Sequence, residues 1–508
     1  MSLLLAFIPI ALILILMVGF RWGAARAGGV GYLSALLIAS LAFGAGPELL
    51  GYAHTRALLL SQDVLYIIWA AFLLYRVADE AGAIRAIGQA LPHLTADRGM
   101  QALVIGWVFA SFLQGVGGFG VPVAVIAPIL VGLGFTPLLA VIVPSLGHGW
   151  SVTFGSLGSS FQALMASTGL PAEVLAPPAA ILLGIAGPAV GFVVAHAVGG
   201  WSAVRRLAAP IALLGVVMSV TQYFLATAGL WNIATFGAGI AGLLVAAPLA
   251  RRYRGQQGSN GLLDRRSLAV AVSGYAVLIL VTLIVQLIPA VNDFLGRIEI
   301  RVDFPAVSTA LGHITPAGPG RVIPVFRHAG AILVYSSILA YLIYWRAGRY
   351  KTGSAGRILS GTLRRVMSSS VSIASMVAMA VIMENSGMTE ALARGLAEGT
   401  GRIYPLVAPW IGALGAFMTG SNTNSNVVFG ALQLRTAEIL GYSAALILGA
   451  QTAGAALASV MAPTKVVVGA STAGMAGREG EVLRKLIGYT VLLLVLTGLL
   501  ALAAVWIF

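Results

Sequence analysis

The sequence predicts an all-α polytopic membrane protein with an inverted structural repeat and paired broken or hairpin helices. The first observation behind this prediction is composition: 59% of the 508 residues are hydrophobic and only 9% are charged, whereas soluble domains carry roughly 25% charged residues. The second is a set of matching residues at nearly constant spacing in the two halves of the chain. The third is a polar, charge-free run inside the apolar sequence, at residues 419–426.

Apolar stretches of a length that crosses a bilayer recur along the chain. We expect about 14 spanning helices, because a span needs roughly 20 apolar residues. Two shorter pieces, 119–133 and 422–435, are too short as helices for a ~30 Å apolar core. They are expected to be re-entrant segments that each reverse the chain direction. The expected spans are 3–20, 30–47, 61–78, 99–113, 137–155, 177–198, 207–226, 233–249, 268–288, 329–346, 366–386, 403–418, 443–460 and 486–507.

Basic residues in the loops indicate the topology. Arg and Lys collect on the cytoplasmic side of membrane proteins, and here they cluster at 251–266 and 346–365. With one reversal at each short piece, the basic loops fall on the cytoplasmic side and both termini face outside. The net charge of +14 therefore indicates topology and contact with anionic lipid, not nucleic-acid binding. The first stretch, 3–20, has no basic region before it and is expected to be a retained helix rather than a signal peptide.

The internal repeat rests on matched residues. Asp79-Glu80 and Gly82 match Glu384-Asn385 and Gly387, Phe112 and Gly115 match Phe417 and Gly420, Gly134-Phe135-Thr136 matches Gly441-Tyr442-Ser443, and Gly147 matches Gly454. Matched spans are expected to run in opposite directions, as in secondary transporters that bind substrate near the bilayer midplane. The expected division is a first repeat over 1–200, two linking helices and a basic loop over 201–267, and a second repeat over 268–508.

The polar run is Thr419-Gly420-Ser421-Asn422-Thr423-Asn424-Ser425-Asn426. Lipid cannot satisfy its donors and acceptors, so at membrane depth it must be buried in protein or line a wet cavity. We expect it to bind substrate through Ser421, Asn422, Thr423, Asn424 and Asn426. Two alternatives stay open: a polar loop at the membrane surface, and helix capping alone, since Ser and Asn are good N-caps.

A glycine-rich run at 114–122 forms the corresponding break in the first repeat. Its glycines expose backbone amides, and a proline near its end suits the first turn of a new helix. A helix N-terminus at the midplane is a ready anion site, so Gln114, Gly118, Phe119 and Gly120 are expected to bind substrate. The alternative is a glycine-rich packing face between helices.

Each break is followed by a second interruption, at 145–151 and 462–465. We expect His148, Trp150 and Ser151 to join the substrate site, with His148 as a proton carrier or a simple hydrogen-bond donor. Lys465 lies in apolar sequence, where a lysine is costly unless paired or wet. It is expected to face an anionic substrate or, alternatively, to snorkel to the cytoplasmic surface. Asp79 and Glu384 are further proton-coupling candidates, with helix-end charges as the alternative.

These runs resemble the lactate permease family, bacterial carriers of 2-hydroxymonocarboxylates. The first similar segments are Gly118-Phe119-Gly120-Val121-Pro122-Val123-Ala124, Leu130-Val131-Gly132-Leu133-Gly134-Phe135 and Phe154-Gly155. The second are the polar run and Phe429-Gly430-Ala431-Leu432-Gln433. The resemblance runs over nearly the whole length. It implies uptake of lactate or glycolate with protons and membership of a wider group of inverted-repeat, elevator-like ion transporters in the bacterial inner membrane.

The chain departs from the family pattern at four places. The family commonly has an acidic residue at the position of Gln114 and an Asp at that of Asn422. His148-Gly149-Trp150-Ser151 replaces an Asn-Thr-Ala-Pro run, and Lys465 is unusual. Two acids lost and a cation gained make the site more positive, which favours an anion and leaves the coupling ion open.

Three classes of function can be compared on residue chemistry. A secondary carrier of a small carboxylate fits best, whether coupled to protons, coupled to sodium or uncoupled; a channel for such an anion stays open. A cation/proton antiporter would want buried Asp or Glu at the breaks. A membrane enzyme would want clustered acids or histidines, but the chain has 16 acids, no cysteine and no phosphate-binding Gly-x-x-x-x-Gly-Lys loop. We therefore expect no enzyme activity, no cofactor and no metal; the expected partners are the substrate anion, H⁺, the lipid bilayer and, as one option, a second copy of the chain.

Overall fold

The computed structural model of the chain describes residues 2–20, 22–118, 120–253, 265–319 and 322–507. Within these ranges, twelve helical stretches are long and apolar enough to cross a membrane, which confirms the prediction of an all-α polytopic membrane protein. The helices of the first half are α1 (Ser2–Leu14), the π-helix η1 (Ile15–Gly19), α2 (Ala24–Ala42), α3 (Pro47–Glu80), α4 (Ala83–Ala90), η2 (Leu91–Leu94), α5 (Arg98–Gln101), the π-helix η3 (Ala102–Phe109), α6 (Ala110–Val116), α7 (Val121–Gly132), α8 (Pro137–Gly147), η4 (Gly149–Ser151), η5 (Ser156–Gly158), α9 (Ser159–Thr168), α10 (Ala172–Thr227), η6 (Trp231–Ile233) and α11 (Ala234–Arg251). Those of the second half are α12 (Arg265–Leu287), α13 (Pro289–Leu295), α14 (Ala329–Arg346), α15 (Ser354–Asn385), α16 (Met388–Thr400), η7 (Gly401–Ile403), α17 (Tyr404–Thr419), α18 (Asn422–Leu440), α19 (Ala444–Ala458), η8 (Ser459–Met461), α20 (Pro463–Thr472) and α21 (Glu479–Ile507).

The two halves repeat one order of elements. A left-handed glycine precedes α4 and its counterpart α16, at Gly82 (φ 71°) and Gly387 (φ 86°). A hydroxyl side chain caps α8 and its counterpart α19, through Thr136 and Ser443. Only a residue that tolerates positive φ suits the first position, and an N-cap oxygen suits the second. The sequence matches therefore mark equivalent backbone features.

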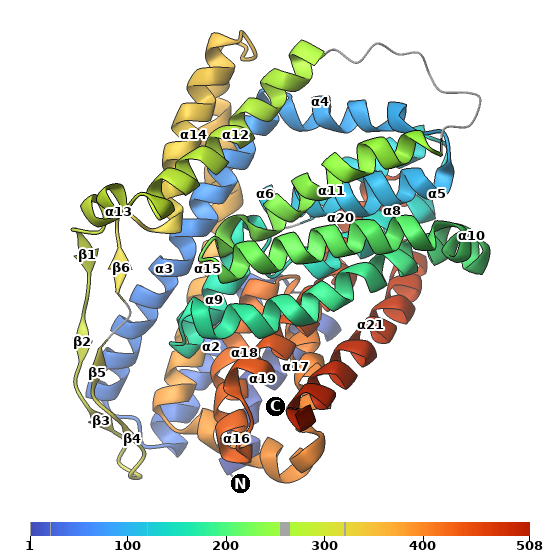
Figure 1. Ribbon diagram of the computed structural model, residues 1–508. Coiled ribbons are helices and arrows are strands. Elements are labelled where there is room, and N and C mark those ends of the chain that lie inside the picture. Colours follow the sequence, from blue (N-terminus) through green and yellow to red (C-terminus); the bar gives the residue numbers. More distant parts are fainter. Residues whose placement is uncertain (1, 21, 119, 254–264, 320–321, 508) are drawn as a thin grey trace.

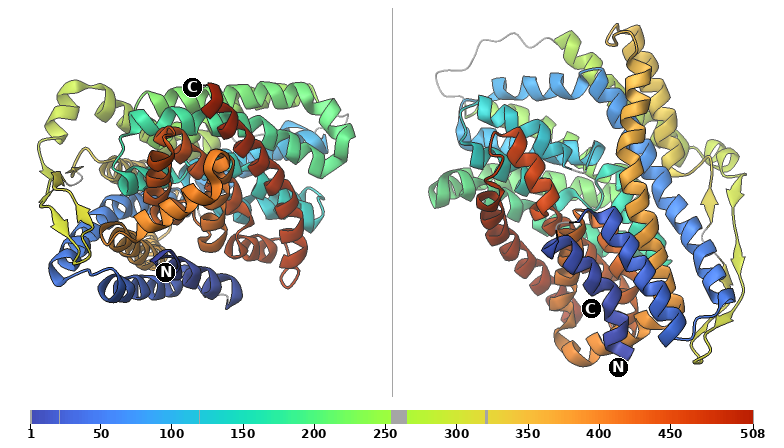
Figure 2. Two further views of the ribbon diagram at one scale, coloured as in Figure 1. Left: turned by 90° about the horizontal axis from the view of Figure 1, so that it is seen from below. Right: turned by 180° about the vertical axis from the view of Figure 1, so that it is seen from behind.

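Equivalent helices run in opposite directions. Arg357, at the start of α15, pairs with Glu80 at the end of α3 (2.7 Å), and Arg56, near the start of α3, pairs with Glu384 at the end of α15 (3.3 Å). The two matched helices are therefore antiparallel and packed together. Figure 1 and the rear view of Figure 2 place the turn between α14 and α15 at the top and both chain termini at the bottom.

A close approach of backbones recurs in both repeats. A Cβ added to Gly147 on α8 would overlap the carbonyl oxygen of Gly106, and one added to Gly454 on α19 would overlap that of Pro409. Glycine at these two positions lets α8 pack against η3 and α19 pack against α17. These contacts bring the break that follows η3–α6 and the break that follows α17 close to the helices that carry the second interruptions.

Helical hairpins form at the two breaks. In the second repeat α18 folds back along α17, since Ser425 donates to Gly412 O (2.7 Å) and Gln433 donates to Ala408 O (2.9 Å). In the first, the shorter α7 packs against α6 and α8. Two boundaries differ from expectation. The helix α18 reaches Leu440, beyond the expected end at residue 435, because the helix continues through Arg435, Thr436 and Glu438, where the apolar pattern stops. The expected spans 177–198 and 207–226 form one continuous stretch, α10, interrupted at Gly199–Gly200.

The described part of segment 289–328 forms a short helix followed by a long β-hairpin. After α13, the strands β1 (Glu299–Ile300), β2 (Asp303–Phe304) and β3 (Val307–Ser308) pair antiparallel with β6 (Ile323–Pro324), β5 (Gly318–Pro319) and β4 (Ile314–Thr315). Figure 1 shows this hairpin beside α3. The boundaries expected for the two repeats and the linking segment remain predictions.

Candidate functional site

The polar run is buried in protein and opens α18. Ser421 is the N-cap and accepts a hydrogen bond from the Asn424 backbone N–H (3.3 Å). Helix capping therefore explains the role of the Ser421 side chain but not the roles of the asparagine side chains. Each of the residues from Asn422 to Asn426 is at most 4% exposed, so this part of the run is not a surface loop.

The amides of the run connect the two repeats. Asn422 Nδ2 lies 3.1 Å from Thr153 Oγ1, and Thr153 in turn contacts the Thr452 hydroxyl at 3.1 Å. Asn426 Nδ2 donates to the carbonyl oxygen of Ser160 (2.9 Å) and to the Thr452 hydroxyl (3.0 Å). The α18 start is thus joined to the segment between η4 and α9 and to α19.

Two carbonyl oxygens in the run have no hydrogen-bond partner in the described part of the chain. These are Asn424 Oδ1 and Asn426 Oδ1, both buried. Asn424 Nδ2 donates to Ser372 Oγ on α15 (3.0 Å), and Thr423 shares a hydrogen bond with Ser160 (3.1 Å). A buried unsatisfied acceptor costs about 1–3 kcal/mol, so these oxygens are available to a donor such as a hydroxyl.

The first break brings backbone close to side chains. Gly118 has φ 54° and Gly120 has φ 86°, and a Cβ on Gly118 would overlap Ser156 Oγ. Gln114, 1% exposed, lies beside this turn, and its Oε1 has no hydrogen-bond partner among the described residues. Phe119, also expected at this site, lies outside the described residues. Ser156 itself has φ 48°, a conformation uncommon for a residue with a side chain. The two segments that meet here, at Gly118 and at Ser156, therefore both have positive φ.

His148 is fully buried at the end of α8. Its Nδ1 lies 2.6 Å from the carbonyl oxygen of Pro144, so this nitrogen carries the proton that is donated. Nε2 then has a free lone pair, and it has no partner within the described ranges. His148 and Lys465 are close enough for their charges to interact.

Lys465 lies between the two breaks. It is 8% exposed, and its Nζ donates to Ser459 Oγ (3.1 Å). A Cβ on Gly120 would be 4.0 Å from Lys465 Cγ, while one on Gly420 would be 2.6 Å from the hydroxyl of Thr464. The first turn of α20 therefore touches the glycines of both breaks. No carboxylate forms an ion pair with Lys465 in the described part of the chain, and its place in the first turn opposes the helix dipole, so an anion would stabilise it.

Trp150 and Ser151 lie at the site but use their donors internally. Trp150 Nε1 donates to Ser111 Oγ (3.0 Å), and the Ser151 hydroxyl donates to the carbonyl oxygen of His148 (2.8 Å). Trp150 also packs against Gly187 on α10. In this arrangement both residues support the turn that carries His148 and do not present a donor to a ligand.

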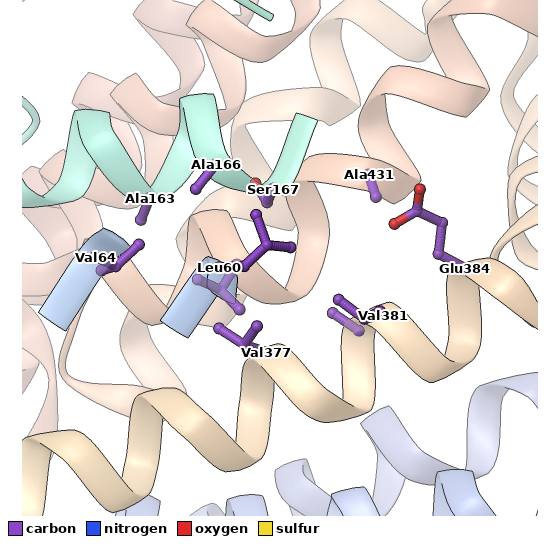
Figure 3. A pocket seen from close by; sticks show the side chains of 11 residues that line it. Leu60, Val64, Ala163, Ala166, Ser167, Val377, Val381, Glu384 and Ala431 are labelled. Atoms are coloured by element: carbon purple, nitrogen blue, oxygen red, sulfur yellow. The ribbon is translucent and has the colours of Figure 1, made fainter. Parts of the chain in front are cut away.

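Asp79 and Glu384 are not brought together with the breaks or with each other. Asp79 pairs with Arg76 (3.0 Å) at one end of the α3–α15 pair, and Glu384 pairs with Arg56 at the other. Glu384 lies at the edge of a small apolar pocket between α3, α9, α15 and α18 (Figure 3). The helix-end alternative describes both acids.

Sequence reasoning missed the polar partners outside the breaks. Thr153, Ser160 and Thr452 hold the asparagines, and Asp63, with 1% exposure, is a buried acid inside α3. A hydroxyl in an apolar stretch is too common to single out. A lone acid within the expected span 61–78 was the available signal.

Comparison with known proteins gives a family match over the whole described length. A family model described as L-lactate permease matches residues 2–508. Glycolate permease GlcA of Escherichia coli K12 is 26% identical, with 100% of this chain and 96% of that protein covered. The L-lactate permease of Streptococcus iniae is 28% identical (86% and 91% covered), and that of Bacillus subtilis 168 is 27% identical (85% and 83%).

Among solved structures, the YdaH transporter of Alcanivorax borkumensis aligns with 87% of this chain and 85% of that chain. The sequence identity is 15% and the TM-score 0.47, which is too distant to carry an argument about this chain.

Proposed function

The chain belongs to the L-lactate permease family, and from this membership and the chemistry of the breaks we propose that it is a secondary active transporter of small 2-hydroxymonocarboxylates such as lactate and glycolate. The relatives that carry these substrates in their names align with most of the chain. Uptake is coupled to protons and proceeds by alternating access with an elevator-like movement. The protein is a multi-pass membrane protein; the proposal places it in the bacterial inner membrane with both termini outside.

One observation carries the substrate class. Lys465 is a buried cation in the first turn of α20, it touches the first break and it lacks a carboxylate partner in the described part of the chain. A carboxylate placed there would be compensated by the ammonium group and by the partial positive charge of the helix N-termini. The acceptor oxygens of Asn424, Asn426 and Gln114 supply the chemistry for a 2-hydroxyl group.

Proton coupling needs a carrier. At the breaks the candidates are His148, whose Nε2 has no partner within the described ranges, and the substrate acid itself. A membrane-buried acid at the breaks, which a cation/proton antiporter would need, is absent from the described residues: Gln114 and Asn422 are neutral. This absence favours the anion carrier over the antiporter. A homodimer would give the fixed frame that an elevator-like movement requires.

The experiment is uptake into proteoliposomes of the purified full chain. Labelled lactate and glycolate are offered with and without an inward proton gradient, and with and without an inward sodium gradient. The proposal expects saturable uptake, counterflow against unlabelled lactate inside, and accumulation only with the proton gradient. Accumulation driven by sodium alone would favour the sodium-coupled alternative. Absence of counterflow by either acid would reject the proposed substrate class.

A further inference from the structure

A second polar cluster lies inside the membrane-spanning part, away from the breaks. Asp63 in the middle of α3 is 1% exposed and His328, the N-cap of α14, is 6% exposed. Asp63 Oδ1 accepts from His328 Nε2 (2.9 Å), and Asp63 Oδ2 accepts from Gln162 Nε2 on α9 (2.7 Å). Burying an ionised carboxylate is costly unless partners are preorganised around it, so a group kept here without a packing role calls for a function.

The hydrogen-bond network fixes the protonation of the histidine. Gly330 N–H donates to His328 Nδ1 (3.1 Å), so Nδ1 is an acceptor and the ring proton is on Nε2, which faces the carboxylate. The ring stacks on Tyr66 (centroids 5.0 Å apart, planes 6° apart), which holds it in this orientation. In this arrangement the pair carries one proton, on His328, and Asp63 is ionised.

A second proton cannot be added without changing these bonds. On His328 Nδ1 it would face the Gly330 N–H and remove the N-cap of α14. On Asp63 it would neutralise the carboxylate; the oxygen keeps a lone pair for the Gln162 N–H, but the hydrogen bond from Gln162 loses its charge assistance and weakens. One proton therefore either removes the N-cap of α14 or weakens the hydrogen bond between Gln162 and Asp63, so the network has two states that differ by one proton.

The helix α9 contacts both Asp63 and the polar run. Gln162 lies on α9, and Ser160, two residues earlier, shares a hydrogen bond with Thr423 (3.1 Å) and accepts through its carbonyl oxygen from Asn426 (2.9 Å). Ser167, at the end of the same helix, donates to the carbonyl oxygen of Asn426 (3.0 Å). A shift of α9 therefore changes the start of α18.

The cluster is reached through a polar cavity of about 640 Å³. Asp63, Gln162 and His328 line it, together with Glu173 and Arg327. Glu173 is exposed, so the cavity opens at the surface beside α13 and the start of α10. It gives protons a route from water to Asp63 that does not pass the breaks.

Among the described residues, Glu173 and Arg327 are the charged side chains that line the cavity together with Asp63 and His328. Arg327 on the α14 side donates to Asn292 (2.9 Å), and Glu173 lies on the α10 side. On α15, behind α3, the described side chains beside Val64 are apolar, and the ion pair of Arg56 with Glu384 lies two turns of α3 from Asp63. The polar side chain from α9 is Gln162, which is neutral.

We propose that Asp63 and His328 form the proton-binding site of the transport cycle, and that Gln162 transmits its protonation through α9 to the substrate site. This inference rests on the proposed proton-coupled function and assigns its proton to a place outside the breaks. Asp63 and His328 are coupling residues in this account, and Gln162 is a positioning residue. Proton binding from the cavity and substrate binding at the breaks are then linked by one helix.

The test compares two modes of transport by the purified full chain in proteoliposomes. Accumulation driven by an inward proton gradient needs proton movement, whereas counterflow of labelled against unlabelled lactate does not. In Asp63→Asn, which keeps the size of the side chain, accumulation should be lost and counterflow retained, with counterflow no longer dependent on pH. Gln162→Met, which leaves the Asp63–His328 pair in place, should show the same loss of accumulation.

Glu173→Gln is the matched control, because this exposed acid lines the same cavity; it should accumulate lactate as the wild type does. Accumulation by Asp63→Asn at the wild-type level would overturn the inference. So would loss of counterflow together with accumulation in a monodisperse Asp63→Asn protein, since that result indicates a structural role. Failure of the proposed function is distinguishable, because the wild type itself would then show no lactate counterflow.

Discussion

The break before α7 is made of glycines, whereas the break before α18 is made of amide and hydroxyl side chains. At each break one helix ends, the chain turns through a glycine with positive φ, and a new helix begins. The first lets backbone approach a side chain closely, with Gly118 against the hydroxyl of Ser156. The second fills its space with hydrogen bonds to Thr153 and Thr452. The two breaks therefore share a backbone arrangement but differ in what constrains them: close packing in the first and hydrogen bonds in the second. Substitutions in the first should disturb folding, and substitutions in the second should weaken substrate binding.

The largest effect is expected at the glycine break. In Gly118→Ala the new Cβ overlaps Ser156 Oγ, and the left-handed conformation (φ 54°) adds about 1–2 kcal/mol of strain. We expect loss of monodisperse protein or loss of lactate counterflow. Gly132→Ala, where an added Cβ meets nothing within 4 Å, is the control and should behave as the wild type. Normal counterflow by Gly118→Ala would show that the first break is not sterically constrained.

The asparagine break should lose affinity rather than folding. Asn422→Ala, Thr423→Ala and Asn424→Ala each remove a buried hydrogen-bonding group, worth about 1.5–3 kcal/mol against a charged ligand, or roughly ten- to hundredfold in apparent affinity. The measurement is the half-saturating lactate concentration of counterflow. Thr55→Ala, whose hydroxyl contacts only its own helix, controls for loss of a hydroxyl. Unchanged half-saturation in all three variants would reduce the run to a helix cap.

His148→Gln should have a smaller effect. Gln cannot reproduce both the bond to Pro144 and the free acceptor at Nε2, so we expect an affinity loss of less than about tenfold, the value of one neutral hydrogen bond. Accumulation driven by a proton gradient should persist, because the proton is assigned to Asp63 and His328. A variant that keeps counterflow but loses accumulation would identify His148 as the proton carrier instead.

The smallest effect is expected at a surface ion pair outside the spanning segments. Burial alone would raise the pKa of Asp97, but hydrogen bonds from Arg206 and from the backbone of Met100 lower it below its ordinary value. The stabilisation is therefore present at neutral pH and is lost as the pH falls through the lowered pKa of the folded state. Because Arg206 is half exposed, Asp97→Asn should cost about 1 kcal/mol or less at neutral pH, and nothing in strong acid. Thermal unfolding in detergent at the two pH values measures this; a large loss would mean that the contact between Asp97 and Arg206 supports the breaks.

Hydropathy and glycine spacing predicted the fold well, for physical reasons. A bilayer sets the length of a spanning helix, and left-handed turns select glycine, so Gly82 and Gly387 mark equivalent helix ends from sequence alone. The length of α18 was underestimated at its C-terminal end, because Arg435, Thr436 and Glu438 interrupt the apolar pattern although the helix continues to Leu440. The long β-hairpin gave no signal, since its strands are two residues each and interrupted.

The sequence predicted which polar residues lie at the candidate site, but not which residues form hydrogen bonds with them. Long-range contacts such as Asn422 with Thr153, or Asp63 with His328, join residues far apart in sequence and follow only from packing. Trp150 was expected to bind substrate, but its indole N–H already donates to Ser111. Composition identifies a polar group that must be satisfied, whereas only the fold shows which neighbour satisfies it.

The most direct test of the anion site is the half-saturating lactate concentration of counterflow in Lys465→Gln, measured beside Lys351→Gln, which removes an exposed loop lysine. Loss of the buried ammonium group should raise half-saturation roughly ten- to hundredfold, the range of a hydrogen bond to a charged ligand, while Lys351→Gln leaves it unchanged. Wild-type half-saturation in a folded Lys465→Gln protein would contradict the account, since the cation at the centre of the proposed site would then contribute nothing to binding the anion.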